Sequence, residues 1–158
     1  MHKVVVIYDS QTGFTEKMAE AVAKGARGVE GVEVELLKLG TPFSTSRLTS
    51  ADAIAFGSPV VYGSITQGMR LFLQSVKEQP RLDLSGKIGG AFGSYAFSGG
   101  WVINEFSEDM MTMGLRIVAP PVAAVDGIGR KQPLRLDKET FQRCTNLGRT
   151  LATSIGDT

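Results

Sequence analysis

Cysteine and histidine are almost absent from this chain. Among its 158 residues, Cys144 is the only cysteine and His2 the only histidine. A disulfide framework and a thiolate metal cluster are therefore excluded, because each needs several such side chains. A single thiol is also typical of proteins from a reducing compartment.

The chain also lacks a long apolar run and a marked net charge. After Met1-His2-Lys3, the first apolar segment, 4–8, is too short for a secretion signal or a membrane span. The 17 basic and 16 acidic residues leave a net charge of +1, which gives no electrostatic reason to bind nucleic acid or a membrane surface. We therefore predict a cytoplasmic protein whose partners are neither nucleic acids nor membranes.

What the chain does have is enough apolar surface for one core. Hydrophobic residues make up 42% of the sequence, so a core can form without disulfides or a structural metal. No linker, repeat or low-complexity segment divides the chain, and its length is typical of one domain. We expect residues 1–158 to form a single domain.

Short apolar runs alternate with segments of helical period. Five strands are expected, over 4–8, 32–39, 53–56 and 87–93 and, in two parts, over 115–118 and 122–125. Pro120 and Pro121 separate the two parts of the last strand, because proline cannot donate to a ladder.

Apolar residues at spacings of three and four predict the helices between these strands. They run over 14–29, along Ile65, Met69, Phe72, Leu73 and Val76, and along Val102, Phe106, Met110 and Met113. The polar stretch 40–51 has room for one short helix. Asp137 is expected to cap a last helix whose inward face carries Phe141, Cys144, Leu147, Leu151 and Ile155, which makes the cysteine a core residue.

Strands that alternate with helices predict an α/β fold. We expect a doubly wound five-stranded parallel sheet with right-handed crossovers and helices on both faces. In such sheets, ligands bind beyond the carboxyl ends of the strands, where the strand order reverses. The loops after the first, third and fourth strands therefore form the candidate site.

The loop after the first strand, 9–15, is suited to bind an anion although it contains no basic residue. It contains Ser10, Thr12, Gly13 and Thr15 but no lysine or arginine, and it leads directly into a helix, whose N–H groups attract negative charge. A nucleotide-triphosphate loop would end in Lys-Ser or Lys-Thr, and a dinucleotide fingerprint would carry three glycines. Both motifs are missing.

The loop after the fourth strand, 93–101, is rich in aromatic residues. Tyr95, Phe97 and Trp101 lie within seven residues, among small and flexible ones. A protein gains little from so much aromatic surface in a loop unless something flat covers it. The loop after the third strand, 57–64, adds Tyr62, so the three loops together predict a phosphate site beside a site for a planar ring.

These loops resemble those of a known family. The segment Ser10-x-Thr12-Gly13-x-Thr15 is similar to the phosphate loop of flavodoxins. Gly90-Ala91-Phe92-Gly93-Ser94-Tyr95, followed by Phe97-Ser98-Gly99-Gly100, resembles the third flavin loop in the flavodoxin domain of the A-type flavoproteins. Those proteins add a di-iron domain, for which one histidine is too few. The likeness spans nearly the whole chain.

The resemblance implies a flavodoxin-like strand order, 2-1-3-4-5, and FMN as the cofactor, with no metal site and no catalytic residue of the protein. Phe97 and Tyr62 are favoured over Tyr95 and Trp101 as the residues that stack on the flavin. The resemblance also implies that the peptide at Gly63 rotates when the ring gains a proton. The implied cofactor-binding residues are Ser10, Gln11, Thr12, Gly13, Phe14 and Thr15; Ser58, Pro59, Val60, Val61, Tyr62 and Gly63; and Ser94, Tyr95, Ala96, Phe97, Ser98, Gly99 and Gly100.

The function so implied is that of an electron carrier. It would shuttle low-potential electrons between redox partner proteins, a reductase or ferredoxin-like donor and an acceptor, as a monomer or small homo-oligomer. The alternative is an FMN-dependent NAD(P)H:quinone oxidoreductase of the tryptophan-repressor-binding-protein type, which uses the same fold. The charge of +1 departs from the acidic surface of most flavodoxins and questions docking to their usual reductases.

Two other functions fit the sequence less well. A phosphoryl-receiver domain needs an aspartate at the end of the third strand, where this chain has Gly57-Ser58, so that function is excluded. A structural domain without a ligand would leave the aromatic loop unexplained.

Overall fold

The computed structural model of the protein describes residues 1–126 and 136–156. In chain order its elements are β1 (His2–Tyr8), α1 (Phe14–Arg27), β2 (Val32–Lys38), α2 (Ser46–Thr49), β3 (Ala53–Val61), β4 (Ser64–Ile65), α3 (Gln67–Glu78), β5 (Ile88–Tyr95), α4 (Gly100–Thr112), β6 (Arg116–Ile117), β7 (Val122–Val125) and α5 (Lys138–Thr153). The expected alternation of strands and helices is confirmed.

The sheet has the strand order β2-β1-β3-β5, followed by a last strand in two parts. β6 pairs with the start of β5, at Ile88 and Gly89, and β7 pairs with its end, from Phe92 to Tyr95. All these pairings are parallel. The doubly wound order and the split of the last strand at Pro120-Pro121 are therefore as the sequence predicted.

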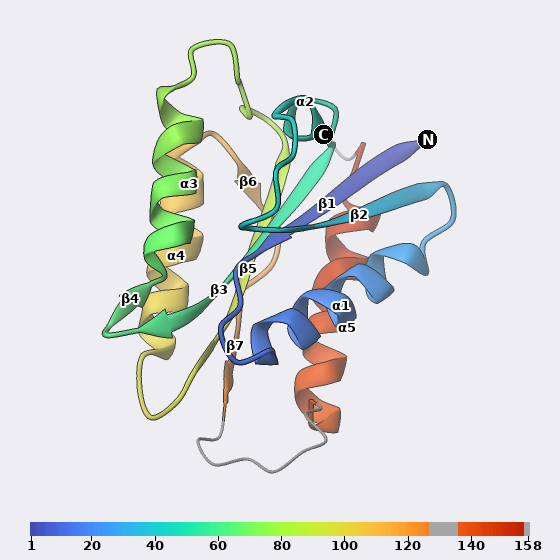
Figure 1. Ribbon diagram of the computed structural model, residues 1–158. Coiled ribbons are helices and arrows are strands. Elements are labelled where there is room, and N and C mark those ends of the chain that lie inside the picture. Colours follow the sequence, from blue (N-terminus) through green and yellow to red (C-terminus); the bar gives the residue numbers. More distant parts are fainter. Residues whose placement is uncertain (127–135, 157–158) are drawn as a thin grey trace.

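Helices cover both faces of the sheet (Figure 1). α1 and α5 lie together on one face and α3 and α4 on the other. Because strand residues alternate in direction, Val4 and Val6 pack into the core on the α1–α5 side, whereas Val5 and Ile7 pack into the core on the α3–α4 side. This explains why β1 carries apolar residues at every position from Val4 to Tyr8 rather than at every second one.

Two glycines let α1 and α5 approach each other at backbone distance. A Cβ at Gly25 would lie 1.9 Å from the carbonyl oxygen of Thr145, and one at Gly148 would lie 1.9 Å from that of Val22. No larger residue fits at either crossing point. Cys144, which precedes Thr145, is fully buried, as expected of a core residue.

The structure corrects the expected elements in several places. β3 runs on to Val61 and β5 to Tyr95, so 57–61 and 93–95, which were expected in loops, lie in strands. α5 ends at Thr153, before Ile155. Ile65 lies in β4, which pairs antiparallel with the end of β3, rather than in the helix that follows. Phe141 was expected to face inward, but its side chain is 37% exposed and lies under the ammonium group of Lys24, 5.4 Å from its ring centre. Over residues 1–126 and 136–156, no helix is both long and apolar enough to cross a membrane.

Candidate functional site

The three predicted loops meet at the carboxyl edge of the sheet (Figure 1). The backbone N–H of Asp9, after β1, donates to the carbonyl of Gly57 in β3 at 3.0 Å. The hydroxyl of Thr15, at the start of α1, lies 2.9 Å from that of Ser94 near the end of β5. The first loop is therefore tied to each of the other two, as a site at the switch point of strand order requires.

The loop before α1 presents several hydrogen-bond donors and no cation. Ser10 Oγ accepts from the N–H groups of Gly13 and Glu16, at 3.1 and 3.3 Å, and among the described residues nothing accepts its own proton. No described group accepts from the N–H of Gln11, Thr12 or Thr15 either. Gly13, with φ of +94°, makes the turn that gives the loop this shape.

Among the described residues, the groups of this loop that attract an anion are dipoles rather than charges. The nearest basic residue in sequence, Lys17, is exposed and pairs with Glu20 at 3.6 Å. Within the described part of the chain, the attractive groups are the N-terminal end of a 14-residue helix and the donors of the loop. This donor set fits the phosphate of a flavin mononucleotide, whereas it lacks the lysine of a triphosphate site.

A buried polar network fastens the first loop to the hairpin of β3 and β4. Asp9 accepts from the hydroxyl of Thr66 at 2.6 Å and from the N–H of Ser10 at 3.0 Å. Thr66 caps α3 by accepting from Met69, and its N–H donates to Ser58 Oγ at 3.1 Å. A Cβ at Gly68 would lie 3.0 Å from the Asp9 carboxylate, so the helix start must stay small there.

The hairpin turn places an aromatic side chain in solvent. Tyr62 and Gly63 join Val61 to Ser64, and both have positive φ, +50° and +74°, as a two-residue hairpin of this hand requires. A tyrosine in this region is strained. Its side chain is fully exposed, which leaves both faces of its ring open to a ligand.

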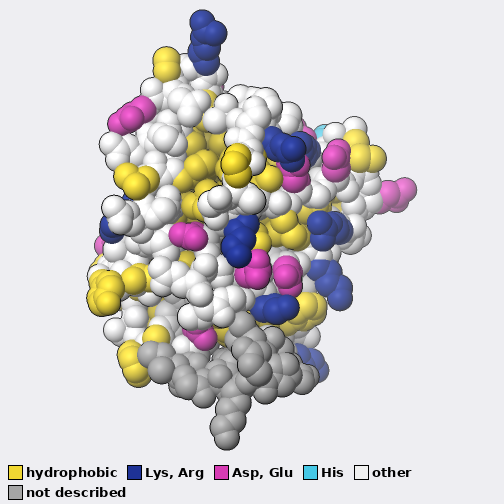
Figure 2. Space-filling model, in the orientation of Figure 1, with side chains coloured by type: hydrophobic (Ala, Val, Ile, Leu, Met, Phe, Trp, Pro, Cys, Tyr) yellow, Lys and Arg dark blue, Asp and Glu magenta, His cyan; other side chains and the backbone are white. Residues whose placement is uncertain are grey.

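The aromatic loop after β5 also exposes aromatic side chains to solvent. Phe97 is 85% exposed, and Trp101 is exposed in the first turn of α4. The backbone below is tight, because a Cβ at Gly99 would lie 2.9 Å from Val60 Cγ1. The Gly99 φ of +120° also suits glycine. Figure 2 shows hydrophobic side chains (yellow) gathered on the surface over the β3–β4 hairpin and the start of α4.

The structure brings most of the nineteen sequence-derived positions together, but it gives them different roles. The ring of Phe14 and the side chains of Thr15, Ser58 and Ser94 are buried and already packed or paired. Three further residues form hydrogen bonds at this edge of the sheet but were not predicted from the sequence: Asp9, Thr66 and Asp126. Asp9 and Asp126 each directly follow a strand at the carboxyl edge, and that position was the available signal.

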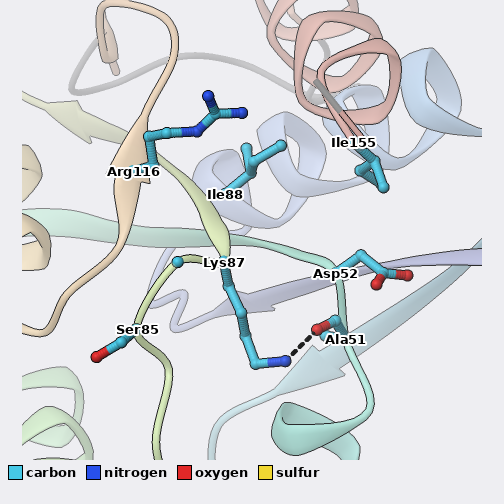
Figure 3. A pocket seen from close by; sticks show the side chains of 9 residues that line it. Ala51, Asp52, Ser85, Lys87, Ile88, Arg116 and Ile155 are labelled. Carbon is cyan, nitrogen blue, oxygen red and sulfur yellow. Dashed lines mark hydrogen bonds between the residues drawn. The ribbon is translucent and has the colours of Figure 1, made fainter. Parts of the chain in front are cut away.

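A hollow lies at the opposite edge of the sheet (Figure 3). This cavity of about 520 Å³ is lined in part by Asp52, Lys87 and Arg116. Lys87 donates to the carbonyls of Ala51 and Thr49, at 2.5 and 2.9 Å, and Asp52 accepts from the N–H of Lys3. These charges fasten the chain to itself, so we assign this cavity no ligand. The part of the chain that the structure describes holds no cluster of three metal-ligating side chains.

The fold brings three loops to its switch point. The first of them, 9–15, is the anion loop, which contains no lysine or arginine. Together these features define a flavodoxin-like α/β protein. The family model described as flavodoxin matches residues 6–139, and the chain belongs to the flavodoxin family. This confirms the resemblance seen in the three loops. A flavin is the cofactor that this family implies.

Two curated relatives span most of the chain. A flavodoxin of Aquifex aeolicus is 37% identical over 163 residues, which cover 96% of this chain and 86% of the relative. An NAD(P)H dehydrogenase (quinone) of Trichlorobacter lovleyi is 32% identical over 148 residues, which cover 77% of this chain and 72% of the relative.

Two solved structures share the whole fold. A flavodoxin from the domain Archaea is 29% identical with a TM-score of 0.79, and the match covers 97% of this chain and 98% of that one. The rubredoxin oxygen:oxidoreductase of Desulfovibrio gigas is 30% identical with a TM-score of 0.81, and the match covers 97% of this chain but 36% of that one. The second likeness is therefore to one part of a longer protein.

Proposed function

We propose that the protein binds FMN and carries electrons between redox partner proteins. One observation carries the proposal. A loop of N–H and hydroxyl donors without a lysine or arginine of its own lies at the same edge of the sheet as the two segments that expose Tyr62 and Phe97. The loop suits the phosphate of FMN, and the aromatic side chains suit its planar ring.

The chain's own residues would divide the work of binding. Ser10 and the N–H groups of Gln11, Thr12 and Thr15 offer donors to the phosphate. Phe14 is buried, so its contribution is to hold the start of α1 in place. Tyr62 and Phe97 would cover the two faces of the ring, and Gly63 has the backbone freedom that peptide rotation at the ring edge needs.

The protein itself supplies no redox group in this proposal. Bound FMN would take up and return the electrons. Cys144 is fully buried, and burial raises the pKa of its thiol to about 12, so it is unsuited to act as a nucleophile. The role of the chain is to bind the cofactor, orient it and leave one edge accessible to a partner.

An electron carrier is favoured over a quinone reductase. The identity with the flavodoxin of Aquifex aeolicus is higher and extends over 96% of the chain, against 77% for the quinone dehydrogenase. The expected partners are a reductase or ferredoxin-like donor and an acceptor protein. We infer further that residues 1–158 act as one domain, in the cytoplasm, as a monomer or small homo-oligomer.

Ligand titration tests the cofactor. The purified protein, freed of flavin, would be titrated with FMN and, separately, with riboflavin, and binding followed by the loss of flavin fluorescence. We expect FMN to bind at least about 100-fold more tightly, as two or more hydrogen bonds to a charged phosphate predict. Equal affinities would contradict a phosphate site at this loop.

Redox titration tests the carrier. The FMN-loaded protein would be reduced stepwise with dithionite, and mixed in parallel with NADPH and a benzoquinone. A carrier should take up its two electrons in separate steps and should oxidise NADPH slowly. A single two-electron step together with rapid NADPH turnover would establish the quinone reductase instead.

A further inference from the structure

The side chain of Asp126 contacts the anion loop, which is distant from it in sequence. The hydroxyl of Thr12 donates to Asp126 Oδ2 at 2.7 Å, although the two residues are 114 positions apart. Asp126 directly follows β7, and its own N–H donates to the carbonyl of Tyr95 at 2.7 Å. The backbone of Asp126 is therefore fixed to the end of β5, and its carboxylate is held beside the loop.

This contact uses the one proton that Thr12 has to offer. A threonine hydroxyl donates a single hydrogen bond, and the oxygen of Thr12 also accepts from the N–H of Phe14 at 3.4 Å. A phosphate oxygen is an acceptor, as a carboxylate oxygen is. Both cannot receive the Thr12 proton at once, and the two anions repel each other.

Ser10 and Thr15 show that Thr12 is a special case. No described residue accepts the proton of Ser10, so that hydroxyl is available to an anion from the start. The hydroxyl of Thr15 is paired with Ser94, a neutral group. Of the three hydroxyls in the loop, Thr12 is therefore the one already bound to a negatively charged acceptor within the described part of the chain.

We propose that Asp126 lowers the affinity of the loop for phosphorylated flavin by competing with the phosphate for the Thr12 proton. Asp126 is then a specificity-determining residue, since riboflavin, which has no phosphate, escapes the competition. The proposal rests on FMN binding at this loop. It adds that the protein prefers FMN over riboflavin less strongly than it would without Asp126.

The direct test is Asp126→Ala, which removes the competing acceptor without adding a donor. We expect this variant to bind FMN about tenfold more tightly than the wild type, the equivalent of one hydrogen bond to a charged group, with riboflavin affinity unchanged. Glu30→Gln is the control, because it removes one negative charge from an exposed residue at the opposite edge of the sheet. It should change neither affinity.

A double-mutant cycle separates competition from simple repulsion. In a Thr12→Val background there is no proton to compete for, so Asp126→Ala should tighten FMN binding much less, by the repulsion between the two anions alone. In a Thr12→Ser background, which restores a hydroxyl, the full gain should return. A gain that is undiminished in Thr12→Val, or one that riboflavin shares, would overturn the proposal.

Thermal melts followed by circular dichroism show whether each variant is folded. If Asp126→Ala is not, Asp126→Leu provides the same comparison, because leucine has nearly the shape of aspartate but neither an acceptor nor a donor. If the wild type itself binds FMN no better than riboflavin, the proposed function fails and the role of Asp126 fails with it. If the wild type prefers FMN and Asp126→Ala changes nothing, only the role of Asp126 fails.

Discussion

The hydroxyl groups of Thr15 and Ser94 lie 2.9 Å apart and are both buried, one at the start of α1 and the other near the end of β5. Their hydrogen bond joins the anion loop to the aromatic loop across 79 residues of sequence. Because neither hydroxyl is open to water, each depends on the other for a partner. The spacing between the loop that follows β1 and the loop that follows β5 therefore depends in part on this pair.

Removing both members of this pair should cost less than the sum of the costs of removing each alone. Thr15→Val keeps the side-chain shape but leaves the Ser94 hydroxyl buried without its partner, which typically costs about 1–3 kcal/mol of the free energy of unfolding. Ser94→Ala should do the same to Thr15. The double variant should lie closer to the wild type than the sum of the two losses, in urea denaturation of all four proteins. Strictly additive losses would contradict the pairing.

Thr12→Val should weaken FMN binding while leaving riboflavin binding nearly unchanged. A hydrogen bond from a hydroxyl to a charged group is typically worth roughly 1.5–3 kcal/mol. We expect a loss nearer to about 1 kcal/mol, because the wild-type hydroxyl must first give up its bond to Asp126. Fluorescence titration with both flavins measures the difference. A larger loss for riboflavin would place the phosphate elsewhere.

Tyr62→Asn should separate stability from binding. Asparagine tolerates the positive φ of this hairpin position better than tyrosine, so the free energy of unfolding should rise by about 0.5–1 kcal/mol. The same change removes the exposed ring, so FMN affinity should fall. Urea denaturation without flavin and FMN titration give the two values. A variant that binds FMN as well as the wild type does would show that Tyr62 does not stack on the ring.

Gly148→Ala should destabilise the protein, although alanine is ordinarily the better helix former. The added methyl group would lie 1.9 Å from the Val22 carbonyl, which forces α5 away from α1. Overpacking of this kind typically costs about 1–3 kcal/mol or more. Gly28→Ala is the matched control, since its nearest neighbour would be 3.4 Å away and its φ is −72°. The control should be neutral or slightly stabilising in thermal denaturation.

Stability should fall at alkaline pH as Tyr8 and Cys144 ionise. Burial, followed by the hydrogen bond that the Tyr8 hydroxyl donates to Glu16, raises the pKa of Tyr8 to about 12 from its ordinary value near 10. The unfolded chain therefore releases this proton first, so the stabilisation is complete below pH 10 and is lost between about pH 10 and 12.

Tyr8→Phe tests this dependence. The variant has no proton to release at this position, so its free energy of unfolding should decline less steeply between pH 10 and 12 than that of the wild type. Cys144, whose pKa is raised to about 12 by burial, keeps part of the decline in both proteins. Urea denaturation at several pH values measures the slopes, and equal slopes would exclude Tyr8 as a cause.

The sequence predicted the layout of the fold because the relevant signals are local. Continuous apolar runs such as 4–8 marked strands covered on both faces, and Pro120-Pro121 marked the break in the last one. β4 was missed because it has only two residues. In addition, the first residue of its turn is tyrosine, whereas asparagine, aspartate or glycine is usual at that position of a hairpin. Phe141 follows the helical period but lies at the rim of α5, where Lys24 covers it.

The site was predicted less completely, because its decisive contacts join distant residues. The loops could be identified from strand ends and residue types. Nothing in the local sequence shows that Thr66 donates to Asp9, 57 residues away, or that Thr12 donates to Asp126. Such pairs become visible only when the strand order sets which loops are neighbours. Hydroxyls that looked equivalent in sequence then acquire different partners and different chemistry.

The division of the last strand by Pro120 and Pro121 also affects how molecules of this protein meet. A continuous outer strand would offer a row of unpaired N–H and C=O groups to which a strand of another molecule could add. Here two successive residues without an N–H interrupt that row between β6 and β7. We therefore expect this edge to resist growth of the sheet from molecule to molecule.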